Sequence, residues 1–290
     1  MPKELPVIQA GARGAASPPI FEKIGIVGLG LIGGSIALKS RELWPASLVI
    51  AVDNKDVLET AMRLHAIDVA ADDLIVLAEC DVVILAAPVK QNVAILAELD
   101  ENVRTAAVVT DTGSTKREIV AAARALPPRF TFVGGHPLAG AARGGLEHAR
   151  ADLFQGRPWL LTTHAEALES FIRALGAEPK VVGVAAHDRL LAFLSHLPQL
   201  AASALMTVVG DAVGEDGLAL AGRGLADTTR LASSPADIWR DIASTNVDEL
   251  GPALDELIAR LQELRRDLPD GDRLAEVFDS AARWRHLLKP

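Results

Sequence analysis

Residues 23–33 read Lys23-Ile24-Gly25-Ile26-Val27-Gly28-Leu29-Gly30-Leu31-Ile32-Gly33, and this stretch decides the fold. An apolar, β-type run stops at a glycine turn, and a helical pattern follows it. Gly28 permits the tight turn, Gly30 lets the backbone approach a pyrophosphate, and Gly33 allows the helix to pack closely on the strand. The N-terminal amides of that helix would then point at the phosphates. The stretch therefore predicts the strand–turn–helix unit of a dinucleotide-binding fold.

An acidic residue follows at the spacing that this fold requires. Asp53 lies 20 residues beyond Gly33, at the end of a second apolar run. A carboxylate there accepts both ribose hydroxyls and repels a 2′-phosphate, so the sequence favours NAD over NADP, although Lys55 leaves NADP open. The turn alone is also compatible with a flavin or S-adenosylmethionine. The predicted cofactor contacts are Gly28, Leu29, Gly30, Leu31, Ile32, Gly33, Asp53 and Pro88, the last of which closes a third apolar run.

Strand and helix patterns alternate through the first two thirds of the chain. Apolar β-type runs occupy 48–53, 81–87, 106–110, 131–134, 159–162 and 180–182, and helical patterns occupy 31–39, 56–64 and 165–175. Continuous apolar strands that alternate with helices are typical of a parallel sheet covered on both faces. Right-handed crossovers then give an α/β, doubly wound, Rossmann-type domain.

The pattern changes near Ala185, after which the apolar residues fall at helical spacing, as at Leu250, Leu254 and Ile258. We therefore expect a loose N-terminal extension (1–20), a dinucleotide-binding domain (21–184) and an all-α C-terminal domain (185–290) for substrate binding and dimerisation. Helical domains of this kind often bury one face against a second copy of the same domain, so a homodimer is the default expectation.

Composition narrows the class of protein. The 290 residues are 50% hydrophobic with a net charge of −9, the balance of a globular protein without the basic surface that nucleic acid requires. No run approaches the ~20 uninterrupted apolar residues of a membrane helix. The single cysteine, Cys80, permits no intramolecular disulfide, which fits a reducing cytoplasm. The histidines show no metal-ligand spacing, so no metal is expected.

The first polar segment directly after a strand is Thr110-Asp111-Thr112-Gly113-Ser114-Thr115-Lys116. Open α/β sheets bind their ligands at such strand ends, which makes Ser114 a candidate catalytic residue. Capping of the helix that runs to Ala125 explains Ser114 equally well. Asp111 and Lys116 have a simple interpretation as turn and surface residues.

The second such segment is Gly134-Gly135-His136-Pro137-Leu138-Ala139-Gly140, which we expect to be a rigid, irregular loop. Histidine is the side chain best suited to accept a proton near neutral pH. The alternative is a loop histidine bonded to its own turn. The position of His136 at a strand end beside a nucleotide site favours catalysis.

The helical domain supplies candidates for substrate binding. Asp227 and Arg230 are three residues apart, so on a helix they would share a face. A buried arginine held by a carboxylate would form a bidentate clamp for a substrate carboxylate, and an ordinary surface pair explains the spacing equally well. His196 is either a substrate contact or a satisfied core histidine, and Arg223 stands near the Asp227 segment.

Together these motifs resemble the prephenate/arogenate dehydrogenase family of tyrosine biosynthesis. They occur in the family's order and cover most of the chain, from about Ile24 to Trp239. The nucleotide turn is generic, whereas the combination is specific. The segments that carry the resemblance are Ile24–Ser35, Asp111–Lys116, Gly135–Gly140, Ala151-Asp152-Leu153-Phe154, Ser195-His196-Leu197-Pro198 and Asp227-Thr228-Thr229-Arg230.

The resemblance implies an NAD-dependent oxidative decarboxylation of prephenate to 4-hydroxyphenylpyruvate, in which C4 of the ring loses hydride and the ring carboxylate leaves as CO₂. By similarity, His136 accepts the proton of the C4 hydroxyl, and Ser114 orients His136 and that hydroxyl. Arg230 binds a substrate carboxylate, Asp227 holds its guanidinium, and His196 positions the substrate from the helical side. The site is thus expected in a cleft between the two domains.

Two departures from the family pattern leave the substrate open. Several prephenate-acting members carry an acid where this chain has Ala142 and a base where it has Ala226. Prephenate is a dianion, and arogenate carries an additional ammonium. Arg143, Arg223 and Arg230, against a net charge of −9, favour the dianion. Arogenate dehydrogenase and a dual-specificity cyclohexadienyl dehydrogenase are the alternatives.

Two other functions fit the sequence less well. A dehydrogenase of small hydroxy acids usually works with a catalytic lysine from its helical domain, and the only lysine after residue 184 is Lys289. A nucleotide-sensing module without catalysis needs no polar residues at the strand ends. The sequence therefore favours an enzyme of the family that it resembles.

Overall fold

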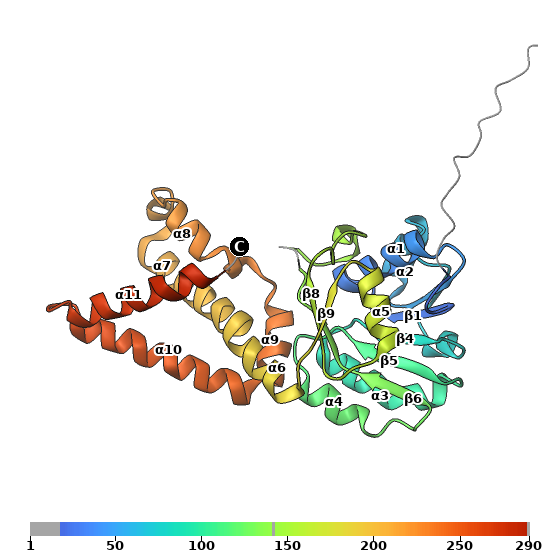
Figure 1. Cartoon of the computed structure of the whole chain (residues 1–290). Coiled ribbons are helices and arrows are strands. Elements are labelled where there is room, and N and C mark those ends of the chain that lie inside the picture. The colour runs from blue at the N-terminus through green and yellow to red at the C-terminus, as the bar shows by residue number, and fades with distance from the viewer. Residues whose placement is uncertain (1–17, 141–142, 289–290) are drawn as a thin grey trace, which may run out of the picture. The chain divides into compact units, whose positions relative to one another are not determined.

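The chain folds into two compact units, shown in the computed structural model of Figure 1, which describes residues 18–140 and 143–288. The first unit comprises Met1–His187 with Ser234–Asp241, and the second comprises Asp188–Ser233 with Ile242–Pro290. Asp241 is held in the first unit, where its Oδ2 accepts a hydrogen bond of 3.4 Å from the Lys90 amide. The sequence pattern did not predict that Ser234–Asp241 belong to the first unit. Most of the predicted N-terminal extension, and Ala142, lie outside the described residues.

The first unit contains a six-stranded parallel sheet in the order β3-β2-β1-β4-β5-β6. This is the strand order of a dinucleotide-binding domain, and the predicted doubly wound fold is confirmed. Strand β3 was not predicted, because it is three residues long and mostly exposed. The strands are β1 (Lys23–Val27), β2 (Leu48–Val52), β3 (Val69–Ala71), β4 (Val82–Leu85), β5 (Ala107–Asp111) and β6 (Phe130–Val133).

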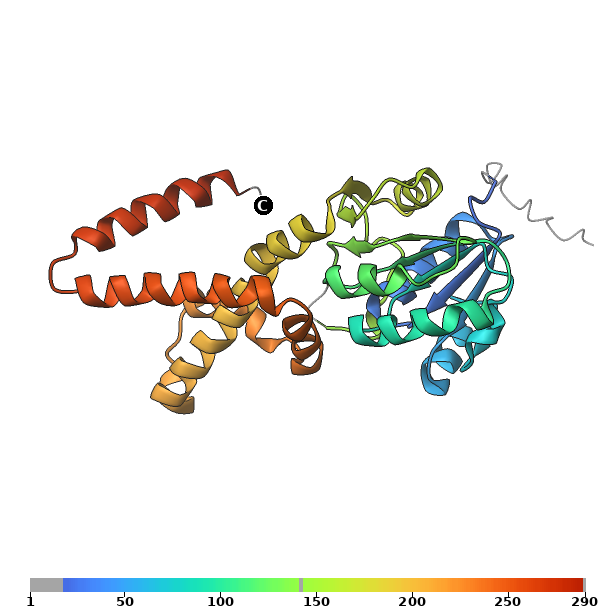
Figure 2. The ribbon, with the colours of Figure 1, turned by 90° about the horizontal axis from the view of Figure 1, so that it is seen from below.

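Helices cover both faces of this sheet. In β4, Val82 and Ile84 join one hydrophobic core, while Val83 and Leu85 join the other, because successive strand residues point to opposite faces. Figures 1 and 2 show α3 and α4 together on one face. The helices are α1 (Leu31–Leu43), α2 (Lys55–Arg63), α3 (Val89–Asn102) and α4 (Arg117–Ala123), with a 3₁₀ turn at Leu74–Leu77.

A smaller sheet completes the first unit, in the order β7-β8-β9, together with helix α5 (Glu166–Ala174) and a 3₁₀ turn at Leu146–His148. Its strands are β7 (Gly135–Pro137), β8 (Pro158–Leu161) and β9 (Glu178–Val181). The prediction of an irregular loop around His136 was wrong, because His136 lies in β7, opposite Leu160 of the antiparallel β8. A three-residue strand that contains glycine and proline carries no β-type pattern, so only its pairing with β8 defines it.

The second unit is helical, as predicted. Its described elements are a π turn at Ala192–His196, α7 (Leu197–Leu218), α8 (Arg223–Thr228), a 3₁₀ turn at Arg230–Ser233, α10 (Val247–Asp267) and α11 (Asp272–Leu287). Helices α6 (Val184–Leu191) and α9 (Ala236–Thr245) cross the boundary between the units. Gly271, whose φ is +82°, joins α10 to α11 in a hairpin. His187 and Asp188 lie inside α6.

The helical run Val184–Leu218 is unusually apolar. Its 35 residues include an 18-residue window with a mean hydropathy of 1.4, long and apolar enough to cross a membrane by length and composition, and 22% of this window is buried within the chain. A criterion of uninterrupted apolar residues does not detect this run, because polar residues such as Asp188 and Arg189 interrupt it. Its exposed apolar side chains are of the kind that association with a partner removes from water.

Candidate active site

The glycine turn after β1 has the geometry of a phosphate cradle. Gly28 has a φ of +94°, and a Cβ there would lie 2.8 Å from the backbone of Ala86. A Cβ on Gly33 would overlap the carbonyl oxygen of Gly28, whereas a Cβ on Gly30 would meet no described atom within 4 Å. Helix α1 begins at Leu31, so its first three amides have no partner inside the helix. The open space at Gly30 and these amides fit a pyrophosphate.

Asp53 directly follows β2 beside this turn. Its Oδ2 accepts a hydrogen bond of 2.6 Å from the Leu29 amide, and its Oδ1 accepts one of 2.6 Å from the Asn54 amide. Asp53 is half-buried, so its carboxylate keeps an accessible edge for ribose hydroxyls. The Leu29 side chain is fully buried and its amide donates to Asp53, and the inclusion of Leu29 among the cofactor contacts stays a prediction. Pro88 precedes α3 at the same edge of the sheet.

Asp111 and Lys116 form an ion pair that is fully buried at the end of β5. The interpretation of these residues as turn and surface residues was therefore wrong for Lys116. Asp111 Oδ2 also accepts from the Gly113 amide (2.8 Å), and its Oδ1 accepts from the Gly135 amide (3.1 Å). The carboxylate thus ties the turn after β5 to β7, the strand that carries His136.

Ser114 lies half-buried in that turn. Helix α4 begins at Arg117 with Lys116 in the capping position, so Ser114 does not occupy the cap that the sequence offered as its alternative role. The place of Ser114 at the carboxyl edge of the sheet, two residues from Lys116, is compatible with a role beside His136.

His136 is buried and contacts a second histidine. Its Nδ1 lies 3.0 Å from Nε2 of His187, which belongs to the part of α6 in the first unit. His136 is 9% exposed and His187 is 1% exposed. Sequence reasoning missed His187, because the pairing joins residues 51 positions apart and no local pattern marks it.

His196 is the buried histidine of the second unit, at the end of the π turn. Pro198 lacks an amide hydrogen, and the preceding Leu197 amide bonds to the Ala192 carbonyl, five residues back, which gives the wider turn. Such turns are frequent at functional sites.

Asn246 fixes the tautomer of His196. Its Nδ2 donates to the carbonyl oxygen of Asp188 (2.9 Å), which identifies the donor end of the amide. The same Nδ2 lies 3.2 Å from His196 Nδ1, so that nitrogen accepts and the ring hydrogen is on Nε2. No local pattern in the sequence indicates the contact between Asn246 and His196, which are 50 positions apart.

Arg230 and Asp227 differ from the predicted clamp. Both are exposed, and within the described part of the chain they form no ion pair with each other. Helix α8 ends at Thr228 and Arg230 begins a 3₁₀ turn, so the helical spacing that would align them is lost. Gln199 instead anchors this segment to α7, by donating to the Leu231 carbonyl oxygen (2.7 Å). Arg223 is exposed at the start of α8.

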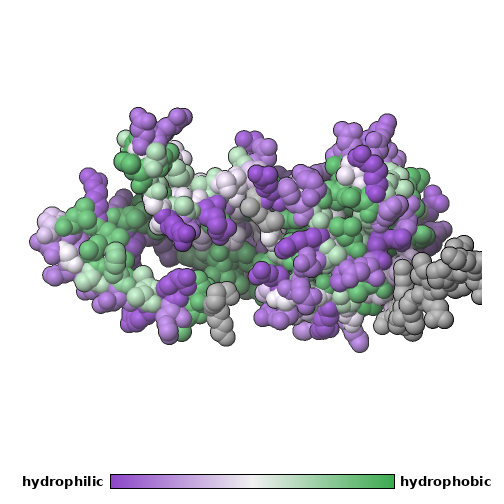
Figure 3. All heavy atoms as spheres, turned by 90° about the horizontal axis from the view of Figure 1, so that it is seen from above, coloured by the Kyte–Doolittle hydropathy of each residue, from purple (hydrophilic) through white to green (hydrophobic). Residues whose placement is uncertain are grey.

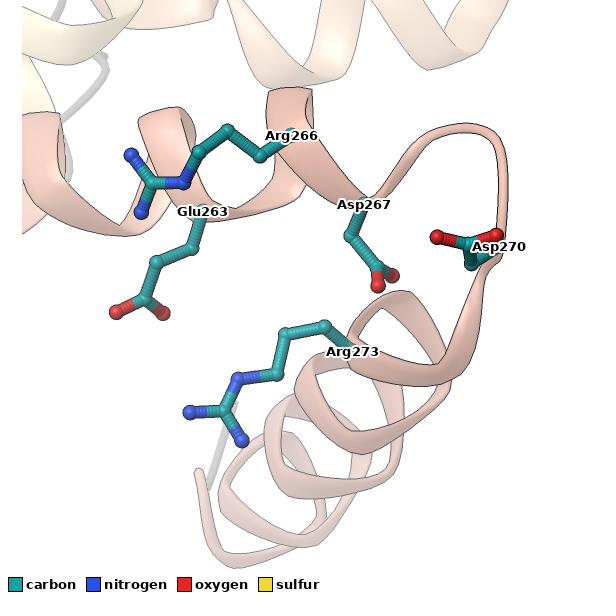
Figure 4. Close-up of a pocket in the computed structure, with 5 residues that line it drawn as sticks. All are labelled: Glu263, Arg266, Asp267, Asp270 and Arg273. Carbon is teal, nitrogen blue, oxygen red and sulfur yellow. The ribbon is translucent and has the colours of Figure 1, made fainter.

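A charged pocket at the α10–α11 turn is a separate feature. Figure 4 shows its lining by Glu263, Arg266, Asp267, Asp270 and Arg273. Asp267 accepts from the Leu274 amide (2.7 Å), and Arg273 pairs with Glu276 on α11. These charged side chains therefore stabilise the turn between α10 and α11. Within residues 18–140 and 143–288, no cluster of three His, Cys, Asp or Glu side chains could hold a metal.

The glycine cradle, Asp53, the strand order and the buried histidine at the carboxyl edge together define a dinucleotide-dependent dehydrogenase. The family model for the nucleotide-binding domain of prephenate dehydrogenase matches residues 36–178, and that for its dimerization domain matches residues 184–280. The chain belongs to the prephenate dehydrogenase family. The predicted resemblance, the assignment as an oxidoreductase and the nicotinamide dinucleotide cofactor are confirmed at this level.

Individual relatives agree with this assignment. The prephenate dehydrogenase of Bacillus subtilis is 33% identical over 90% of this chain and 74% of its own length. The structure of A. aeolicus prephenate dehydrogenase with hydroxyphenyl propionate and NAD⁺ has a TM-score of 0.84 at 26% identity, over 92% of this chain and 98% of that one. Synechocystis arogenate dehydrogenase has a TM-score of 0.74 at 27% identity, over 92% and 100%.

Proposed function

We propose that the chain converts prephenate to 4-hydroxyphenylpyruvate by NAD-dependent oxidative decarboxylation in tyrosine biosynthesis. The observation that carries the proposal is the buried imidazole of His136 in β7, a strand that Asp111 ties to the carboxyl end of β5 in the sheet that also carries the nucleotide cradle. Bound NAD⁺ supplies the hydride acceptor. The protein's part is to bind the substrate, exclude water and take one proton.

His136 accepts the proton of the substrate hydroxyl in this proposal. Its burial excludes bulk water, and the antiparallel pairing with β8 fixes its backbone. Ser114 orients the hydroxyl from the turn after β5, and Asp111 holds that turn against Gly135, next to His136. Loss of a positioned base typically costs about 10²–10⁴ in rate.

Substrate carboxylates are bound by the helical unit. Arg230 supplies an exposed guanidinium on a segment that Gln199 anchors, and His196 supplies its Nε2 hydrogen. Arg223 adds positive charge, and Asp227 acts as a neighbouring carboxylate that can pair with Arg230 once the substrate orders the segment. Arg230→Ala should weaken binding or turnover by about 2–4 kcal/mol. Unchanged kcat and KM in Arg230→Ala would show that Arg230 does not bind the substrate.

The choice between prephenate and arogenate is tested by NADH formation from each purified substrate. We expect a higher kcat/KM with prephenate, because Arg143, Arg223 and Arg230 provide cationic groups for a dianion against a net charge of −9. Equal rates would make the enzyme a dual-specificity cyclohexadienyl dehydrogenase, and a reversed preference would make it an arogenate dehydrogenase.

The base is tested by His136→Asn, which keeps a polar side chain and removes the proton acceptor. We expect kcat to fall while NAD binding stays unchanged. Turnover that survives largely intact would contradict the assignment.

Asp53 sets the preference for NAD over NADP. In Asp53→Asn, the amide oxygen can still accept from the Leu29 amide, whereas the bond from the Asn54 amide is lost together with the charge. We expect the ratio of kcat/KM with NAD to that with NADP to fall, since repulsion of a 2′-phosphate disappears. An unchanged ratio would contradict the ribose role of Asp53.

A cytoplasmic homodimer is the second part of the proposal. The helical unit exposes large apolar side chains, including Leu220 (88%), Trp284 (70%) and Phe278 (65%), and apolar patches are visible over it in Figure 3. Isolated chains rarely expose such surfaces. A match to the family's dimerization domain, which begins at residue 184, supports a second copy as the cover for the apolar run Val184–Leu218.

A further inference from the structure

We infer that His187 is a positioning residue that holds His136 in the one tautomer able to take the substrate proton. The inference rests on the proposed role of His136 as base. It assigns a function to a buried histidine that no motif identified.

The geometry of the pair is well defined. His136 Nδ1 and His187 Nε2 are 3.0 Å apart, which is hydrogen-bond distance, and the ring centroids are 5.2 Å apart at 57°. The backbone of each residue is held in place: that of His136 by pairing with Leu160, and that of His187 by a hydrogen bond of 2.8 Å from its amide to the Gly183 carbonyl oxygen. Neither ring therefore needs to move for the contact to persist.

One hydrogen lies between the two nitrogens, and its location decides the chemistry. If His136 carries it on Nδ1, the Nε2 of His136 has a lone pair and can act as a base. If His187 carries it on Nε2, neutral His136 is protonated at Nε2 and cannot accept. A neutral His187 with its hydrogen on Nδ1 selects the first arrangement, because its Nε2 can then only accept.

The same contact supports His136 after proton transfer. The substrate O–H bond breaks, and a new N–H bond forms at His136 Nε2. The resulting imidazolium still donates from Nδ1 to His187 Nε2, so a buried cation keeps a hydrogen-bond acceptor. In serine hydrolases a carboxylate performs this orienting task, whereas here the acceptor is a neutral ring.

Two amide variants of His187 provide a matched test. The Oε1 of Gln in His187→Gln reaches the position of the histidine Nε2, whereas the shorter Asn in His187→Asn reaches only the position of Nδ1. Steady-state kinetics with prephenate and NAD are measured for both, together with NAD binding and the thermal midpoint. His164→Leu, at an exposed histidine in the same unit, is the control.

We expect His187→Asn to lower kcat by roughly a hundredfold with little change in KM, because the base is misoriented while the binding groups are intact. His187→Gln should recover most of the lost kcat, and His164→Leu should match the wild type. Adding His187→Asn to His136→Asn should cost no further activity, since the two residues act as a unit.

Three results would overturn the inference. They are wild-type kcat in His187→Asn, an equal loss in the Asn and Gln variants, and additive losses in the double variant. These are distinct from failure of the proposed function, which appears as an active His136→Asn. If His136→Asn is inactive and His187→Asn is fully active, His136 remains the proposed base and only the positioning role of His187 is contradicted.

Discussion

At the scale of single residues, Gly30 and Gly33 look alike in the sequence and have different tasks. A methyl group at Gly33 would overlap the Gly28 carbonyl, whereas one at Gly30 meets open space. Gly33→Ala should therefore lower the free energy of unfolding. Gly30→Ala should change that free energy by about 0.5 kcal/mol or less, yet weaken NAD binding, because its methyl group occupies the space of the pyrophosphate.

Urea unfolding and calorimetric titration with NAD separate these two effects. A Gly30→Ala variant that binds NAD as tightly as the wild type would show that the pyrophosphate lies elsewhere. A fully stable Gly33→Ala variant would show that α1 can move away from β1.

Cys80 is a buried thiol without catalytic character. Burial, with a further contribution from the neighbouring Asp81 carboxylate, raises the pKa of Cys80 to about 12. At about pH 8 almost none of the native thiol is the reactive thiolate. We expect a disulfide reagent to label the folded protein slowly and to label one thiol per chain in denaturant. Cys80→Ala, which has no thiol, measures the background of the assay. Rapid labelling of the folded protein would contradict the burial of Cys80.

At the scale of elements, the Asp111–Lys116 pair connects the turn after β5 to β7. Asp111→Asn leaves a buried ammonium without its counter-charge, which typically costs about 3–5 kcal/mol. The exposed pair Arg260–Glu263 provides the control, because Arg260→Ala should cost less than about 1 kcal/mol. The free energy of unfolding from urea titration measures both. Equal, small losses would mean that water reaches the Asp111 site.

The elements that the sequence predicted are those with long local patterns. The run around Val83 is continuously apolar because the strand is covered on both faces, and such a run is legible without tertiary information. Strand β7 and the π turn before Leu197 have no such pattern. The first is defined by its pairing with β8, and the second by a proline that removes one amide from the helix.

The predictability of the site follows the same rule. Gly28 and Asp53 stand directly after strands, and His136 follows the end of β6 by three residues, where topology gathers side chains at one edge, so position in the sequence identified them. His187 and Asn246 act through contacts with residues 50 or more positions away, and no spacing indicates such contacts. The Asp227–Arg230 pair is not formed within the described residues, because the helix ends between the two residues; their role at the substrate stays a prediction.

At the scale of the whole molecule, the two units differ in how they bury their apolar side chains. The first unit encloses two cores on either side of its sheet. The second leaves Leu220, Phe278 and Trp284 largely exposed. Exposed apolar side chains of this size favour association, because association removes their area from water, and this is the basis of the proposed dimer.

The dimer is tested on α11. Phe278 is 65% exposed, and Arg283 lies roughly 140° around the same helix, so Phe278→Glu and Arg283→Gln change the net charge equally on different faces. Light scattering should give the wild type and Arg283→Gln about twice the chain mass of 30.6 kDa. It should give Phe278→Glu a smaller mass at low concentration. The thermal midpoint of the wild type should rise with protein concentration, because association stabilises the folded chain by mass action. A wild type that stays monomeric, with a midpoint independent of concentration, would leave the apolar face of the second unit to another partner.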